Sequence, residues 1–143
     1  MAATTNAAND SAGVRFGVKA GQVVQEFGYD DDVDSGLRSE LEEATGTELV
    51  DEDYDDVTDM ALVWWREDDG DTHDLTDLLV DTLTTLEDDG FVWVLTPKAG
   101  RQGHVGAPEV GEAARTAGLH STSTISAAEH WSGFRLTSRG RGR

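Results

Sequence analysis

The sequence predicts an α/β domain of three layers, with a mostly parallel sheet and a C-terminal antiparallel hairpin. Two continuous apolar runs, at residues 60–65 and 91–95, are typical of strands buried on both faces in the middle of a sheet. A helical pattern of leucines lies between them, which makes a strand–helix–strand unit with parallel strands. Two β-like stretches close the domain, 119–126 and 130–138, and the three residues between them predict an antiparallel hairpin.

The first half of the domain is predicted from shorter patterns. Residues 22–27 form a β-rich run, and residues 47–50 are expected to form a second short strand. Between them we expect a helix over 33–45, ended by Gly46. Its apolar residues recur at helical spacing, at Val33, Leu37, Leu41 and Ala44.

Two more helices are expected in the second half. An amphipathic stripe within 71–90 predicts a helix that Gly90 closes. The stripe consists of Leu75, Leu78, Leu79, Thr82, Leu83 and Leu86. A further helix is expected over 107–118, with Pro108 in its first turn and Gly118 past its last.

The tryptophans are expected to serve packing. Trp64 and Trp65 are neighbours on one strand, so one of them must face each helix layer. Trp131, in the terminal hairpin, is expected to be partly exposed and is a candidate for an interface.

The chain is predicted to be one domain over 14–138, with a disordered leader at 1–13 and a basic tail at 139–143. The N-terminal residues are small and polar and lack the features of a signal peptide, and no apolar run approaches a membrane span. Cysteine is absent, which excludes disulfides and thiol chemistry. A cytoplasmic protein is therefore expected.

The charge is strongly asymmetric. The net charge is −18, but the segment from Glu26 to Asp89 alone holds 25 acids and two bases, a net of −23. The rest holds four acids and nine bases, a net of +5. This pattern argues against nucleic acid or an anionic membrane as a partner and favours a basic protein. The alternative is that the acids only keep the protein soluble. The oligomeric state is not predicted.

The aspartates of "EFGYDDDVDSG", residues 26–36, are interpreted as helix caps. They lie at or before a helix start, where side-chain oxygens accept unpaired backbone N–H groups. Asp71 or Thr72 is expected to cap the next helix in the same way. The EF-hand pattern fails in both places, because its glycine and its twelfth-position glutamate are missing, so no metal site is expected.

The best candidate for a ligand site is the loop over 96–108. It follows a central strand and should lie at the carboxyl edge of the sheet, where open α/β folds bind ligands. Its cations and flexible backbone could enclose a small anion. The candidate residues are Lys98, Arg101, Gly103 and His104. The alternative is a mobile connection whose cations pair with neighbouring acids.

The order of elements resembles a shortened class I methyltransferase-type Rossmann fold, with too few residues between Val50 and Met60 for the helix and strand usually found there. The chain is also similar to an actinobacterial family of short acidic proteins without an established activity. That resemblance covers residues 14–140 and rests on four segments, "GVKAGQVVQEFGYDDDVD", "DMALVWWREDDGD", "FVWVLTPKAGRQGHV" and "HWSGFRLTSRG".

The methyltransferase resemblance implies a cofactor loop with the pattern E/D-x-G-x-G-x-G after the first strand. Here Glu26 and Gly28 match, but the second and third glycines are absent. Asp51 lies where the resemblance implies a ribose-binding acid. We therefore expect no cofactor, and a non-catalytic binding or regulatory protein that acts through its acidic surface. The alternatives are a reduced methyltransferase-like enzyme dependent on S-adenosylmethionine, in which Lys98 and Arg101 contact the substrate, or a small-anion-binding protein.

Overall fold

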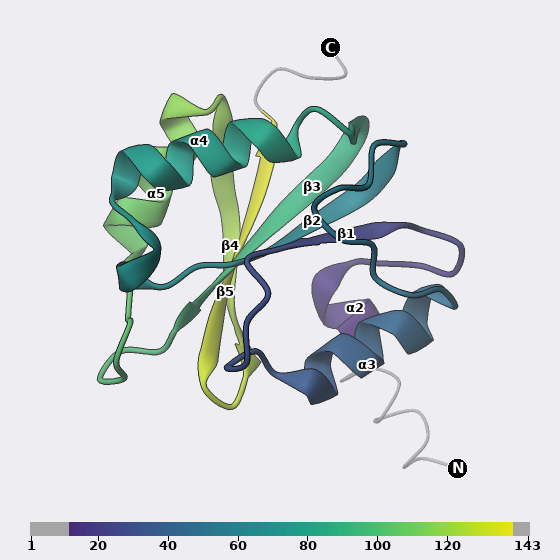
Figure 1. Ribbon diagram of the computed structural model, residues 1–143, viewed down its shortest axis with the longest axis horizontal. Coiled ribbons are helices and arrows are strands. Elements are labelled where there is room, and N and C mark those ends of the chain that lie inside the picture. The colour runs from purple at the N-terminus through teal and green to yellow at the C-terminus, as the bar shows by residue number, and fades with distance from the viewer. Residues whose placement is uncertain (1–11, 139–143) are drawn as a thin grey trace.

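The computed structural model describes residues 12–138, which form one five-stranded sheet with helices on both faces (Figure 1). The elements in chain order are α2 (Ala12–Phe16), β1 (Val24–Phe27), α3 (Ser35–Thr45), β2 (Thr58–Trp64), a 3-10 turn (Glu67–Asp69), α4 (Thr72–Thr82), β3 (Leu86–Pro97), α5 (Ala107–Thr116), β4 (Leu119–Ala128) and β5 (Trp131–Ser138). The α/β class and the order of the main strands are as predicted.

The strand order is β1-β2-β3-β5-β4. β1 pairs with β2 and β2 with β3 in parallel, whereas β5 runs antiparallel to both β3 and β4. The terminal hairpin is thus confirmed, and a mostly parallel sheet is only partly right, because two of the four strand pairs are antiparallel. β5 lies between β3 and β4, so the second strand of the hairpin pairs with the rest of the sheet and the first strand forms its edge.

The prediction of a strand at residues 47–50 is wrong. Only Val50 pairs with the sheet, in an isolated parallel bridge to Gln25. The amide side chain of Gln25 donates to the carbonyls of Asp51 and Tyr54, at 3.0 Å each, and so satisfies the backbone of the next turn. Five of the six residues after Val50 are acidic, and such side chains disfavour a longer strand packed against the core.

Each face of the sheet has its own apolar cluster. α4 and α5 cover one face, with Leu75, Leu79 and Val110 in the cluster, and α2 and α3 cover the other face (Figure 1). Trp65 belongs to the first cluster and Trp64 to the second, which confirms that these neighbours point to opposite faces. The central strands are apolar on both sides because both sides are covered.

The helix predicted within 71–90 ends earlier than expected, at Thr82. The Thr82 hydroxyl donates to the carbonyl of Leu79 at 2.6 Å, which satisfies a carbonyl at the helix end. Leu86, predicted in the helical stripe, instead begins β3. Gly90 lies inside that strand, where a β-carbon would overlap the Leu86 side chain and the carbonyl of Asp59. The glycine therefore permits close strand packing and does not stop a helix.

The helix-cap prediction is confirmed at Asp34 and Asp71 but is wrong for Asp32, whose carboxylate accepts from Arg66 instead. The Asp34 carboxylate accepts from the N–H of Leu37 at 2.8 Å and caps α3. Asp71 caps α4, and its partner Asp74 returns a hydrogen bond from the N–H of Asp71, so the two form a capping box. Gly46 ends α3 in the left-handed conformation, with φ of 78°.

Two boundary expectations need correction. Ala12 and Gly13, placed in the leader, are the first residues of α2, and Ala12 is fully buried. Residues 1–11 and the tail at 139–143 lie outside the described part of the chain. Trp131 was expected to be partly exposed, but it is 4% exposed because it packs edge-on against Trp64. Within residues 12–138, no helix combines the length and apolar character needed to cross a membrane.

Candidate functional site

The carboxyl ends of β1, β2 and β3 lie at one edge of the sheet because these strands are parallel. β1 is the point where the chain reverses direction across the sheet: the Val50 bridge lies on one side of β1 and β2 lies on the other. Open α/β folds bind ligands in the crevice outside such a switch point. In this chain that position, between Gly28 after β1 and Arg66 after β2, is named here the switch-point crevice after its place in the fold.

Arg66 lies in the switch-point crevice, and the residue is 9% exposed. Its Nε donates to Oδ2 of Asp32 at 3.0 Å, and its Nη2 donates to Oδ1 of the same carboxylate. Its Nη1 donates to the carbonyls of Gly28 (2.7 Å) and Trp64 (3.2 Å) and to Oδ2 of Asp69 (3.3 Å). All three guanidinium nitrogens are therefore hydrogen bonded within the chain.

The electrostatics of this cluster favour the charged pair. Burial works against the charged form of Arg66, but its hydrogen bonds and its attraction to Asp32 and Asp69 outweigh burial, and its pKa is raised. The pKa of Asp32 is lowered, mainly by the hydrogen bond from Arg66. The guanidinium carbon also lies 5.4 Å from the centroid of the Trp131 ring, within the range of a cation–π contact.

Both backbone polar groups of Gly28, its N–H and its carbonyl, are hydrogen bonded. Its N–H donates to Oε2 of Glu52 at 2.9 Å, and its carbonyl accepts from Arg66. Gly28 is in the left-handed conformation, with φ of 78°, and a β-carbon there would overlap the carbonyl oxygen of Trp64. The close approach of the two loops therefore requires glycine at this position.

Glu26, the acid of the expected cofactor pattern, is 6% exposed and is already paired. Its carboxylate accepts from Nε and Nη2 of Arg38, at 2.7 and 2.9 Å, and from Nε1 of Trp64 at 2.8 Å. The bidentate bond raises the pKa of Arg38. Asp51 lies after Val50 and is exposed, and its carboxylate accepts from the N–H of Asp53.

A separate pocket of about 310 Å³ lies at the same edge of the sheet, between the starts of α4 and α5. We name it the α4–α5 pocket. It is lined by Trp65, Glu67, Gly70, Asp71, Thr72, Leu75, His104, Val105 and Glu109. Its floor is apolar, because Trp65, Leu75 and Val105 are buried. Three carboxylates lie around that floor, and none of them forms an ion pair with another residue in 12–138.

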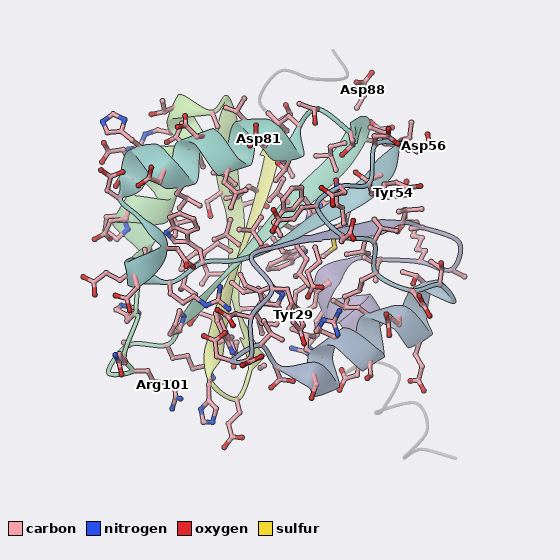
Figure 2. The ribbon with its side chains drawn as sticks, in the orientation of Figure 1. Tyr29, Tyr54, Asp56, Asp81, Asp88 and Arg101 are labelled. Atoms are coloured by element: carbon pink, nitrogen blue, oxygen red, sulfur yellow. The ribbon has the colours of Figure 1, made fainter. Side chains whose placement is uncertain are left out.

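The predicted anion-binding residues are engaged in different contacts. Nζ of Lys98 donates to the Ser126 hydroxyl at 2.7 Å, toward the β4–β5 hairpin. Nδ1 of His104 lies 2.8 Å from the carbonyl of Pro97, and His104 lines the acidic α4–α5 pocket. Arg101 lies at the tip of the loop and points away from the body (Figure 2). Anion binding by this loop stays a prediction.

Gly103, the remaining residue of that prediction, has a structural role. Its carbonyl accepts from the N–H of Glu67 at 2.9 Å, and a β-carbon there would lie 3.4 Å from the Arg66 β-carbon. It therefore packs the loop after β3 against the loop after β2. Among the described residues, no three His, Asp or Glu side chains are grouped as metal ligands.

Arg66 was missed in the sequence interpretation, although a signal was present. Only two bases, Arg38 and Arg66, occur among the 25 acids between Glu26 and Asp89. Both form bidentate bonds to carboxylates near the end of β1. A base in an otherwise acidic segment, placed directly after a buried strand as Arg66 is, could have indicated a buried ion pair.

S-adenosylmethionine does not fit the residues of the switch-point crevice. A glycine-rich loop leaves room for a cofactor to lie against the backbone. Here that room beside Gly28 is taken by the carbonyl of Trp64, as the overlap with an added β-carbon shows. The N–H and carbonyl of Gly28 are both occupied, by Glu52 and Arg66.

Several solved structures with a similar fold are methyltransferases. The O-methyltransferase NcsB1 from neocarzinostatin biosynthesis, in complex with S-adenosylmethionine, aligns with a TM-score of 0.64 and 16% identity over 82% of this chain and 49% of its own. The mitomycin 7-O-methyltransferase MmcR aligns with a TM-score of 0.62 and 12% identity over 83% of this chain and 50% of its own. The chain thus spans about half the length of these enzymes, and at this identity the likeness shows the fold alone.

A shorter neighbour is a SAM-dependent methyltransferase from Bacteroides fragilis in complex with S-adenosyl-L-homocysteine. It has a TM-score of 0.61 and 12% identity over 89% of this chain and 76% of its own.

In sequence, the chain is 48% identical over 122 residues to uncharacterized proteins of Mycobacterium tuberculosis and Mycobacterium bovis, which covers 85% of this chain and 75% of theirs. The family model described as "Protein of unknown function (DUF3052)" matches residues 13–140, and the chain belongs to that family.

Proposed function

We propose that this protein is a non-catalytic binding protein with a shortened methyltransferase-like fold, and that it acts in the cytoplasm by contact with a basic protein partner. The single observation that carries the proposal is the α4–α5 pocket. Its carboxylates, from Glu67, Asp71 and Glu109, have no ion-pair partner in residues 12–138 and surround an apolar floor.

The chemistry of this pocket suits a lysine or arginine side chain of a partner. The methylene stem of such a side chain would lie against Trp65 and Leu75, and its charged end would lie among the carboxylates. The surrounding surface is acidic and would raise the rate of encounter with a basic protein. A regulatory role of such contact is part of the proposal.

The test is binding of a fluorescent Lys/Arg-rich peptide, measured by polarization at low and high salt. We expect binding at low salt and a steep loss at high salt. The double variant Glu67→Gln/Glu109→Gln should weaken binding about five- to tenfold, by analogy with exposed charge pairs. The control Glu43→Gln/Glu48→Gln makes the same charge change at the end of α3, where both residues are exposed. Absence of binding at low salt, or equal weakening by the control, would refute the pocket as the site.

A second candidate is a reduced methyltransferase-like enzyme, favoured by the fold of the neighbours described above. In that case Glu26, Gly28 and Asp51 would contact the cofactor, and the bonds of Gly28 to Glu52 and Arg66 would have to break. Calorimetric titration with S-adenosylmethionine and S-adenosyl-L-homocysteine decides between the two. Saturable binding at micromolar concentrations would support the enzyme, and no heat at millimolar ligand would remove it.

A further inference from the structure

The strongest unassigned feature of the molecule is the cluster of acceptors that surrounds the Arg66 guanidinium in the switch-point crevice. Five hydrogen bonds from Arg66 end on acceptors that come from three different parts of the chain. These parts are the loop after β1, the end of β2 and the turn after β2. The acceptors are therefore arranged as they would be around a bound ligand, and the group that they hold is the chain's own Arg66 side chain.

The geometry matches a guanidinium group in particular. The two Asp32 oxygens accept from Nε and Nη2, which is the parallel fork that an ammonium cannot make. The third nitrogen, Nη1, lies between the carbonyls of Gly28 and Trp64. The Trp131 ring adds an aromatic surface near the same group.

The same contacts are wrong for an anionic or acceptor-rich ligand. The groups that face the guanidinium are two carboxylates and two carbonyls, all of them acceptors. The N–H of Gly28, a donor that could contact such a ligand, is bonded to Glu52. A cofactor would have to displace Arg66 and leave the Asp32 carboxylate without its partner.

We propose that the switch-point crevice is a guanidinium-binding site and that Arg66 is its built-in ligand, in the place where an open α/β fold takes a cofactor. This inference does not depend on the proposed partner at the α4–α5 pocket. It states that the crevice selects a guanidinium ligand over an adenosyl cofactor.

The test is chemical rescue of Arg66→Ala by ethylguanidinium, followed by thermal unfolding. The substitution should lower Tm by roughly 5–10 °C, because it leaves Asp32 and two carbonyls without a donor. Ethylguanidinium at low millimolar concentration should recover a few degrees with a saturable dependence. Ethylammonium and ethylurea at equal concentration and matched ionic strength should recover less than a quarter of that shift.

The matched control is Arg101→Ala, which removes the same side chain from the tip of the exposed loop (Figure 2). Wild type and Arg101→Ala should show no saturable response to ethylguanidinium. The proposal is overturned if folded Arg66→Ala shows no response, or if all three proteins respond equally. It is also overturned if S-adenosylmethionine raises the Tm of the wild type.

Arg66→Lys keeps the proposal testable if Arg66→Ala does not fold. Lysine retains the stem and the charge but lacks the fork. A Tm several degrees below that of the wild type supports recognition of the guanidinium shape. A Tm equal to that of the wild type shows that any cation suffices and contradicts the proposal.

Discussion

The switch-point crevice and the α4–α5 pocket lie at the same edge of the sheet, but their carboxylates differ in whether the chain pairs them with a base. In the crevice, the acids nearest the sheet are paired with Arg66 and Arg38 inside the chain. In the pocket, three carboxylates surround an apolar floor and have no ion-pair partner within residues 12–138. The difference teaches that high acidity alone does not mark a binding site. What matters is whether the chain neutralises the acids itself.

The largest expected effect comes from Gly28→Ala, which tests how tightly the crevice is closed. The left-handed conformation and the overlap with the Trp64 carbonyl should together cost about 3–4 kcal/mol of unfolding free energy. Gly46→Ala is the matched control, because Gly46 has the same φ of 78° but no atom lies within 4 Å of an added β-carbon. That control should cost about 1 kcal/mol. Equal losses in denaturant unfolding would show that the two loops are not in close contact.

Glu26→Gln should have the next largest effect, because it weakens a buried charge pair. The carboxylate of Glu26 is 6% exposed and accepts from both Arg38 and Trp64. We expect a loss of about 2 kcal/mol in unfolding free energy. In contrast, Glu40→Gln weakens a pair with Arg15 at 3.7 Å, in which Glu40 is half exposed, and should change stability by less than about 0.5 kcal/mol. A small effect at Glu26 would contradict the assignment of a buried pair.

Asp71 allows capping and pocket charge to be separated, because it both caps α4 and lines the α4–α5 pocket. Asp71→Ala removes the cap and should cost about 1 kcal/mol in thermal or denaturant unfolding. Asp71→Asn keeps a capping oxygen and should preserve stability, while it weakens binding of the basic peptide. If Asp71→Asn binds the peptide as well as the wild type does, Asp71 has no part in the pocket's electrostatics.

The smallest expected effect is a pH dependence from Asp32. Its pKa is lowered in the folded protein, so its contribution to stability is complete above its ordinary pKa of 3.8. That contribution is lost as pH falls from 3.8 through the lowered value. Because Asp32 is 53% exposed, the contribution should be below about 1 kcal/mol.

Denaturant unfolding between pH 2 and pH 6 tests this sign. Asp32→Asn should have a flatter pH profile at the acid end than Asp31→Asn, the exposed neighbour. A steeper profile for Asp32→Asn would mean that the pKa is raised instead of lowered.

The sequence predicted the buried strands and helix caps well, because both depend on local patterns. The apolar runs of β2 and β3, and Asp34 and Asp71 before their helices, have few alternative interpretations. The predicted end of α4 was wrong because the helical spacing of apolar residues continues through Leu86. Only the pairing of Leu86 with Thr58 makes that residue part of a strand.

The candidate site was less predictable, because its contacts join residues far apart in the chain. Arg66 and Asp32 are 34 positions apart, and neither has a neighbour that indicates the other. The missing glycines after Gly28 predicted a loop unsuited to a cofactor, and that stays a prediction. They could not show that an arginine bonds to the backbone and carboxylates of this loop. Trp131 was misjudged for the same reason, since its burial depends on Trp64 in another strand.

The central claim is that the guanidinium of Arg66 is held in the switch-point crevice, and arginine side-chain nitrogen NMR tests it most directly. We predict separate Nη1 and Nη2 resonances and slow proton exchange for Arg66, because its three nitrogens are bonded to fixed acceptors. Arg101, on the exposed loop, should show averaged and fast-exchanging signals in the same spectrum. Addition of S-adenosyl-L-homocysteine should leave the Arg66 signals unchanged. Averaged signals for Arg66, or their shift on titration, would contradict the account.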